Sequence, residues 1–273
     1  MNKSLRSCLL KALVLGSALA VFGMLLAIVL YILRQGIPQL RPSLFARTYT
    51  RENQSLLPAL LNTLQTVLLT LSFALPAGIG GAVYLTEYAP GGSRVVKLIR
   101  TMTETLAGIP SIVYGLFGFL FFVLSLGMGN SILSGALTLA IMVLPTLLRA
   151  TEEALLAVPG SFREASFSLG AGRLRTVFRI LLPAAARGIF SGVILAVGRI
   201  LGETAALIYT AGTVAGRAQS LTDSGRTLSV HLYCLLNEGL YMKEAYATAV
   251  VLLFLVFGIN VLSELLAKGI SGR

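Results

Sequence analysis

The sequence predicts an all-α integral membrane protein with six transmembrane helices. Of its 273 residues, 56% are hydrophobic and only 12% are charged, and the mean hydropathy is +0.85. A soluble domain carries about twice that share of charged residues. Long runs such as residues 116–124 are apolar on every side, whereas the strand of a membrane barrel alternates apolar and polar residues. The composition therefore excludes an ordinary soluble domain, and the runs indicate helices.

Six segments reach or approach the roughly 20 apolar residues that a membrane-spanning helix needs. They are residues 10–33, 59–85, 109–126, 132–148, 188–212 and 245–266. The first could pass for a signal peptide, because Lys3, Arg6 and Lys11 precede its apolar run. That run continues to Leu33, which is too long for the apolar region of a signal peptide. We therefore expect a retained first span in residues 1–58 and a core of five spans in residues 59–273.

The distribution of basic residues predicts the orientation of the spans. Of the 22 Lys and Arg residues, 14 fall on the side of the N-terminus, 7 fall on the opposite side, and Arg199 lies inside the fifth span. Basic residues accumulate on the cytoplasmic side of a membrane. The sequence thus places both termini in the cytoplasm, and it explains the net charge of +11 without nucleic-acid binding.

The polar segment between the fourth and fifth spans, residues 149–187, predicts two short helices. Pro159-Gly160 indicates a turn, and Ser161 followed by Glu164 matches a capping box at a helix start. Gly170 and Gly172 can adopt the left-handed conformation that ends a helix. A second helix is expected over residues 173–182, ending near Pro183.

The first of these helices has one small, partly apolar face. Phe162, Ala165, Ser166 and Leu169 recur at helical spacing. Such a face fits a groove on a partner protein. The alternative is an amphipathic helix that lies on the lipid surface.

A spaced pattern within this segment favours the partner protein. Glu164-Ala165, Gly170 five residues later, and Ile180-x-Leu182-Pro183 after nine more residues resemble the "EAA" loop of ABC importer permeases. Ser166 stands at the third position, where the loop has alanine. The resemblance implies that residues 149–187 form a cytoplasmic loop that docks on an ATPase subunit.

The sequence offers no candidate for chemistry within this chain. No Gly-Lys-Ser or Gly-Lys-Thr tripeptide is present to hold nucleotide phosphates, so ATP is expected on a partner subunit, and no cofactor is expected here. No nucleophile, base and acid are arranged as in a catalytic triad. His231, the only histidine, is interpreted as a polar residue on a short outer helix, and no metal site is expected. The chain is predicted to be a transporter subunit, not an enzyme.

The fifth span carries two charges that a membrane helix rarely tolerates. Arg199 and Glu203 are four residues apart, so a continuous helix would place them on one face. Each charge near the bilayer centre costs about 2.5 to 3.5 kcal/mol. Either they line a substrate path, or they neutralise each other and brace the packing beside Gly198 and Gly202.

Three blocks narrow the resemblance to one kind of importer. They are Arg199-x-x-Gly-Glu-Thr204, the Leu-Leu-Arg-Ala-Thr-Glu-Glu of residues 147–153, and the Gly-Ile-Pro-Ser-Ile-Val-Tyr-Gly-Leu of residues 108–116. Together they resemble the permease of the phosphate-specific ABC importer, of the PstA type. The resemblance implies the type I permease fold in a bacterial inner membrane, and a route lined by Arg199, Glu203 and Thr204.

The same resemblance implies three kinds of partner beside the membrane lipid: a second, homologous permease, a pair of ATPase subunits and an extracytoplasmic phosphate-binding protein. Three alternatives stay open at this point. A permease for molybdate or sulfate would share the EAA-like loop. A secondary transporter would show inverted repeats, and none is found in the sequence. A membrane scaffold or sensor would leave the loop unexplained.

Overall fold

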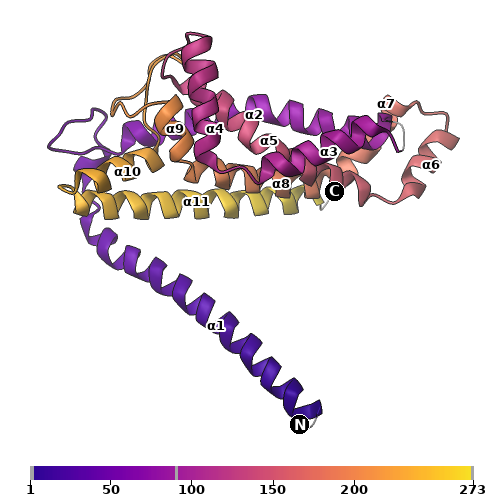
Figure 1. Cartoon of the computed structure of the whole chain (residues 1–273), viewed down its shortest axis with the longest axis horizontal. Helices are drawn as coiled ribbons and strands as arrows, with labels where there is room; N and C mark the ends of the chain where they lie inside the picture. Colours follow the sequence, from indigo (N-terminus) through magenta and orange to yellow (C-terminus); the bar gives the residue numbers. More distant parts are fainter. Residues whose placement is uncertain (1–2, 90–91, 272–273) are drawn as a thin grey trace.

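The computed structural model describes residues 3–89 and 92–271, which form a helical bundle without a strand in those ranges (Figure 1). The α-helices are α1 (Lys3–Gly36), α2 (Leu57–Val83), α3 (Arg94–Ala107), α4 (Ser111–Gly118), α5 (Ile132–Leu156), α6 (Gly160–Ser168), α7 (Arg173–Thr176), α8 (Leu182–Gly202), α9 (Ala205–Thr210), α10 (Leu228–Glu238) and α11 (Met242–Ser271). Two 3-10 helices, η1 (Ile37–Gln39) and η2 (Pro42–Phe45), follow α1. Three π-helical segments extend longer helices: η3 (Tyr84–Tyr88), η4 (Phe119–Ser125) and η5 (Val177–Leu181).

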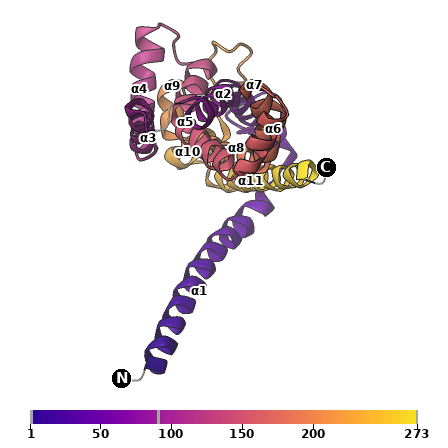
Figure 2. The same cartoon turned by 90° about the vertical axis from the view of Figure 1, so that its right-hand side faces the viewer.

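Helix α5 lies at the centre of the bundle, between α2 and α8 (Figures 1 and 2). Its inward side chains, such as Leu139, Met142 and Leu147, are fully or almost fully buried in the main apolar core. The α8–α5 contact is unusually close, because an added Cβ at Gly188 would lie 2.5 Å from the Cβ of Ala154. Small residues let two membrane helices approach in this way.

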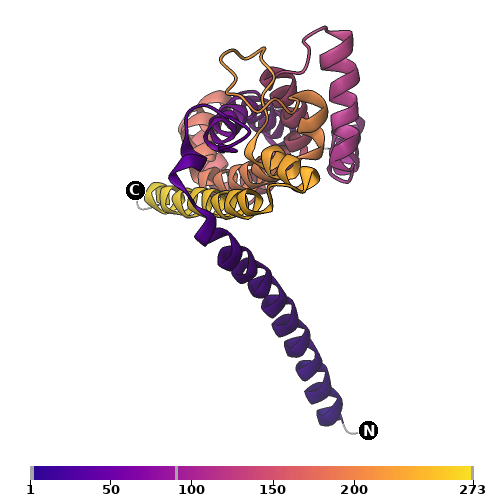
Figure 3. The ribbon, with the colours of Figure 1, turned by 90° about the vertical axis from the view of Figure 1, so that its left-hand side faces the viewer.

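Helix α1 stands apart from the bundle. It leaves the other helices at its C-terminal end and extends away from them (Figures 1 and 3). None of its most apolar stretch is buried against the rest of the chain. Its end is held to α11, where Tyr31 and Tyr246 meet edge to face with their hydroxyls 3.2 Å apart. An apolar helix so exposed must lie against lipid or another subunit.

Residues 3–89 and 92–271 include five helices that are long and apolar enough to cross a membrane, or six if one bent pair is counted as a span. Predicted spans one, two and six correspond to α1, α2 and α11. The fourth was predicted to end at residue 148, but α5 continues to Leu156. The polar residues that suggested an end are paired here: Glu152 with Arg100 of α3, and Glu153 with Arg149.

The predicted third span, residues 109–126, corresponds to only one arm of a bent pair of helices. Helices α3 and α4 meet at 103° around Gly108–Pro110, and only the pair together passes as a span. Pro110 lacks an amide donor and disfavours helical geometry in the residue before it. The second arm, α4 with η4, consequently turns away from the direction of α3 and extends beyond the other helices of the bundle (Figure 1), with Phe117, Phe121 and Phe122 packed together on it.

The predicted bounds of the fifth span, residues 188–212, are wrong at both ends. The helix runs without a break from Arg173 through Pro183 to Gly202. A proline removes one backbone donor and displaces the preceding carbonyl. The π-helical turn η5 just before Pro183 changes the hydrogen-bond register, so the helix continues where an end was expected.

Candidate functional site

The α6–α7 segment, residues 159–181, lies at one end of the bundle (Figure 1). We call this the α6 end, and the opposite end the α10 end. Helix α6 starts two residues earlier than expected, with Pro159 instead of Ser161 at its N-cap and no side-chain cap. The predicted capping box of Ser161 and Glu164 is therefore wrong, and both side chains are exposed. The cause is that the extended backbone of Pro159 begins the helix at Gly160.

Arg163 anchors α6 to the bundle. Its Nη2 donates to Glu87 Oε1 at 2.7 Å, and its Nε donates to the same oxygen at 3.0 Å. It also donates to the carbonyls of Val158 and Leu155, each at 3.1 Å. One side chain thus joins α6 to the ends of α2 and α5. Sequence reasoning missed Glu87, although it is an acidic residue at the end of an apolar span.

A second contact holds α6 against α7. Ser166 is buried, and its Oγ lies 2.8 Å from Thr176 Oγ1. The turn between the helices has Gly170 in the left-handed region at φ +77°, as predicted. The same prediction for Gly172 is wrong, because its φ is −73° and it begins α7 in extended geometry. The chain has already turned at Gly170, so Gly172 needs no special conformation.

The α6–α7 segment exposes a set of apolar side chains that no described residue covers. The most exposed is Leu169 at 88%. The others are Phe162, Phe167, Leu174 and Phe178. Ala165 is exposed as well, whereas Ile180 and Leu182 are half-buried. The predicted face of Phe162, Ala165, Ser166 and Leu169 is therefore divided, since Ser166 is buried against Thr176 of α7. The exposed apolar residues are suited to a protein groove.

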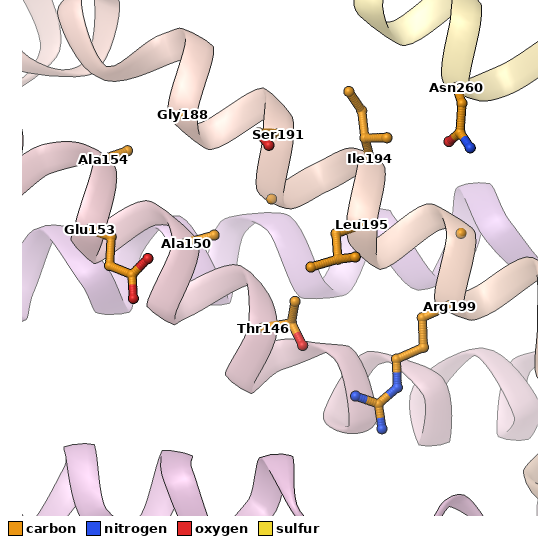
Figure 4. A pocket seen from close by; sticks show the side chains of 12 residues that line it. Thr146, Ala150, Glu153, Ala154, Gly188, Ser191, Ile194, Leu195, Arg199 and Asn260 are labelled. Atoms are coloured by element: carbon orange, nitrogen blue, oxygen red, sulfur yellow. The ribbon is translucent and has the colours of Figure 1, made fainter. Parts of the chain in front are cut away.

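A pocket of about 960 Å³ opens between α5, α8 and α11. Figure 4 shows the Arg199 side chain leaving α8 on the side where Thr146 of α5 lies. Ser191 and Asn260 add polar groups to the lining, and Glu153 lies farther along α5. The Arg199 guanidinium makes no ion pair or hydrogen bond with any residue that the structure describes. Its charge is free to meet an anion.

Glu203 does not share this pocket. The helix ends at Gly202, and Glu203 adopts extended geometry with φ −73° and ψ 128°. Its carboxylate is buried and accepts from the amide of Ala206 at 3.2 Å, at the start of α9. Within the described ranges no ion pair joins it to Arg199. The expected placement on one helix face is wrong because the helix stops between the two residues.

Thr204 continues the break between α8 and α9. Its Oγ1 lies 3.4 Å from the carbonyl of Gly202, and it is not among the residues that line the pocket. Sequence reasoning missed the other polar members of the lining, Thr146, Ser191 and Asn260. They come from three different helices. Each is a single polar residue in an apolar span, and no sequence pattern indicates that the three lie together.

Residues 74–273 match the family model described as "Binding-protein-dependent transport system inner membrane component". The match covers most of the chain and includes α5, the α6–α7 segment and the Arg199 pocket. The chain belongs to this family of ABC importer permeases.

Proteins of similar sequence include two that are named for phosphate transport. The chain is 38% identical over 203 residues to "Probable ABC transporter permease protein YqgI" of Bacillus subtilis, with 70% of this chain and 68% of that protein covered. It is 36% identical to "Phosphate transport system permease protein PstA" of Mycobacterium leprae, with 74% and 67% covered. A PstA homolog of Mycoplasma pneumoniae is 31% identical over 88% of this chain, which spans only 38% of that protein.

Solved structures of type I ABC permeases share the fold. A bacterial alginate ABC transporter aligns with a TM-score of 0.69, 19% identity and 96% of both chains covered. The methionine transporter MetNI in an inward-facing conformation aligns with a TM-score of 0.66 and 20% identity, over 79% of this chain and 95% of the other. At identities of 19% and 20%, these alignments show a shared fold and nothing about the substrate.

Proposed function

We propose that this permease forms the translocation path for inorganic phosphate in an ATP-driven importer. The observation that carries the proposal is the unpaired Arg199 guanidinium in the pocket between α5, α8 and α11. A guanidinium stays charged at every working pH and offers paired donors to a tetrahedral oxyanion. Arg199 is half-buried, and a partly desolvated cation without a counter-ion is costly, so an anionic substrate is its natural partner. The relatives named for phosphate transport support this choice.

Arg199 is the residue assigned to contact the anion, and Glu203 has a different task. The Glu203 carboxylate caps the start of α9, and its backbone carbonyl accepts from Ser229 Oγ at 2.6 Å. These bonds fix the point where α8 ends, four residues after Arg199. Glu203 is therefore proposed as a positioning residue that sets the end of the path, together with Thr204.

Coupling to ATP hydrolysis is assigned to the α6–α7 segment. Its apolar side chains Phe162, Phe167 and Leu169 are exposed, while Arg163 ties the same helix to α2 and α5. A partner that pushes on the exposed face would move both helices of the bundle through that tie. We assign the exposed face to a groove on a separate ATPase subunit that binds the ATP.

The remaining partners follow from the uncovered surfaces. Helix α1 and the α4 arm are apolar and exposed, which suits pairing with a second, homologous permease. The excess of basic residues at the α6 end assigns that end and both termini to the cytoplasm. The α10 end then faces outward, where an extracytoplasmic phosphate-binding protein would deliver the substrate.

Uptake of ³³P-phosphate by cells tests the proposal. Cells that lack this chain are compared with the same cells carrying the wild-type chain, with ³⁵S-sulfate uptake measured in parallel. The proposal expects the chain to restore phosphate uptake and to leave sulfate uptake unchanged. Restoration of sulfate uptake in place of phosphate would assign the path to another oxyanion.

A further inference from the structure

We propose that the α10 end of the permease carries a second anion site, in which Arg47 and Arg217 hold the transported oxyanion before it reaches Arg199, and the buried charge of Arg226 behind them strengthens the attraction. The proposal rests on the proposed function for the identity of the anion. It does not rest on the Arg199 pocket, since none of the three arginines lines that pocket.

The first observation is a buried cation without a counter-ion. Arg226 is 4% exposed, and its Nε and Nη2 are sealed from solvent with no hydrogen-bond partner. No carboxylate pairs with it in the part of the chain that the structure describes. Its Cζ lies 4.8 Å from the centre of the Tyr49 ring. A cation–π contact offsets only part of the cost of burying a charge.

In the described ranges, no titratable neighbour of Arg226 forms an ion pair with it. His231 is one titratable neighbour, and its ring lies edge to face with that of Tyr49. Burial, and then the charge of Arg226, lower the pKa of His231 to about 3, so it is neutral at any physiological pH. Asp223, close in sequence, is already engaged, because its Oδ2 accepts from the amides of Gln219 and Ser220. The proposed counter-ion of Arg226 is therefore an anion from outside the described residues.

The second observation is a pocket beside the buried cation. Tyr49, which contacts Arg226, also lines an open pocket of about 680 Å³. Arg47 and Arg217 stand on the same lining, and neither forms an ion pair within the described residues. Two exposed guanidinium forks, with a third charge behind the ring, match a dianionic oxyanion in charge and in donor geometry.

The third observation connects this pocket to the path. Arg226 is followed by Thr227 and Ser229, whose hydroxyl oxygens lie 3.1 Å apart. Ser229 Oγ donates to the carbonyl of Glu203, at the break just beyond Arg199. The segment that holds the second site is thus bonded to the end of α8. In the proposed orientation it lies on the side from which phosphate arrives.

Equilibrium binding of ³³P-phosphate to the complete importer in nanodiscs, without binding protein or ATP, tests the site. The double variant Arg47→Gln, Arg217→Gln should weaken phosphate binding by at least about tenfold, which corresponds to about 1.4 kcal/mol. The control Arg41→Gln, Arg51→Gln removes the same charge from exposed residues outside the pocket and should bind phosphate as the wild type does. Arg226→Met should also weaken binding, and Arg226→Lys should retain most of it.

Two further measurements distinguish the second anion site from the proposed function and from a docking site for the binding protein. Arg199→Gln should abolish uptake while leaving the binding that depends on Arg47 and Arg217. Failure of the wild-type chain to transport phosphate, with this binding intact, would refute the proposed substrate and leave the site. Wild-type binding by the Arg47, Arg217 double variant would overturn the site. That result together with weaker docking of the phosphate-loaded binding protein would assign the arginines to carboxylates of that protein.

Discussion

Arg163 Nη2 lies 2.7 Å from Glu87 Oε1 and thereby joins α6 to the end of α2. The two side chains are 22% and 10% exposed, so solvent screens the pair only weakly. The same guanidinium also binds the carbonyls of Leu155 and Val158. A force applied to α6 would therefore reach α2 and α5 through one side chain.

Glu87→Gln should weaken this tie and uncouple ATP hydrolysis from transport. Hydrogen bonds to a charged group contribute about 1.5 to 3 kcal/mol, so we expect a lower melting temperature and more ATP hydrolysed per phosphate imported. Both are measurable in proteoliposomes. Glu52→Gln, an exposed carboxylate at the opposite end of the bundle, is the control. An unchanged ratio of ATP hydrolysed to phosphate imported in Glu87→Gln would show that the Arg163–Glu87 ion pair has no role in coupling.

Two glycines of the α6–α7 segment make a matched pair. An added side chain meets nothing within 4 Å at Gly170 or at Gly172, but only Gly170 has positive φ. Gly170→Val should be strained by about 1 to 2 kcal/mol, which misdirects α6, abolishes uptake and loosens the ATPase. Gly172→Val should transport normally. Both variants should insert into the membrane, and co-purification measures ATPase binding. Equal activity of the two variants would exclude a role for the turn.

His231 should make the stability of the complex depend on pH. Its pKa is lowered from the ordinary 6.5 to about 3 by burial and by Arg226. The unfolded chain therefore binds this proton at a higher pH than the folded chain does, and stability falls as the pH drops below about 6.5. We expect the melting temperature to fall between pH 7.5 and pH 5, and to fall less in His231→Leu. An equal fall in both would contradict the assignment.

Reporter fusions test the orientation. Fusions after Lys97 and Arg173 should behave as cytoplasmic, and fusions after Arg47 and Arg217 as extracytoplasmic, because the basic residues concentrate at the α6 end. Alkaline phosphatase and green fluorescent protein report the two sides. The reverse pattern at any two positions would refute the orientation, and with it the side on which the second anion site is placed.

The membrane class and most of the spans could be predicted because apolar length is a strong local signal. The failures lie where tertiary contacts override local pattern. Helix α5 was predicted to end at residue 148 but ends at Leu156, because Arg100 of α3 supplies a partner for Glu152. The helix passes Pro183 because a π-helical turn precedes it. Neither feature can be read from hydropathy.

The candidate site was predictable in part. Arg199 stood out in the sequence as a charged residue within an apolar span, and the structure places it in a pocket. The assumption of a continuous helix wrongly placed Glu203 beside it, since Glu203 caps α9 instead. Asn260 could not have been joined to the site, because only the packing of α11 against α8 brings it to the pocket.

Phosphate uptake by Arg199→Gln, in a complex shown by co-purification to be assembled, tests the account most directly. We expect uptake to be severely reduced, because the variant removes the fixed charge that offsets dehydration of the anion. The double variant Arg199→Gln, Glu203→Gln should stay inactive, since the two side chains are not paired with each other. Uptake near the wild-type level in either variant would contradict the assignment of Arg199 to the phosphate path.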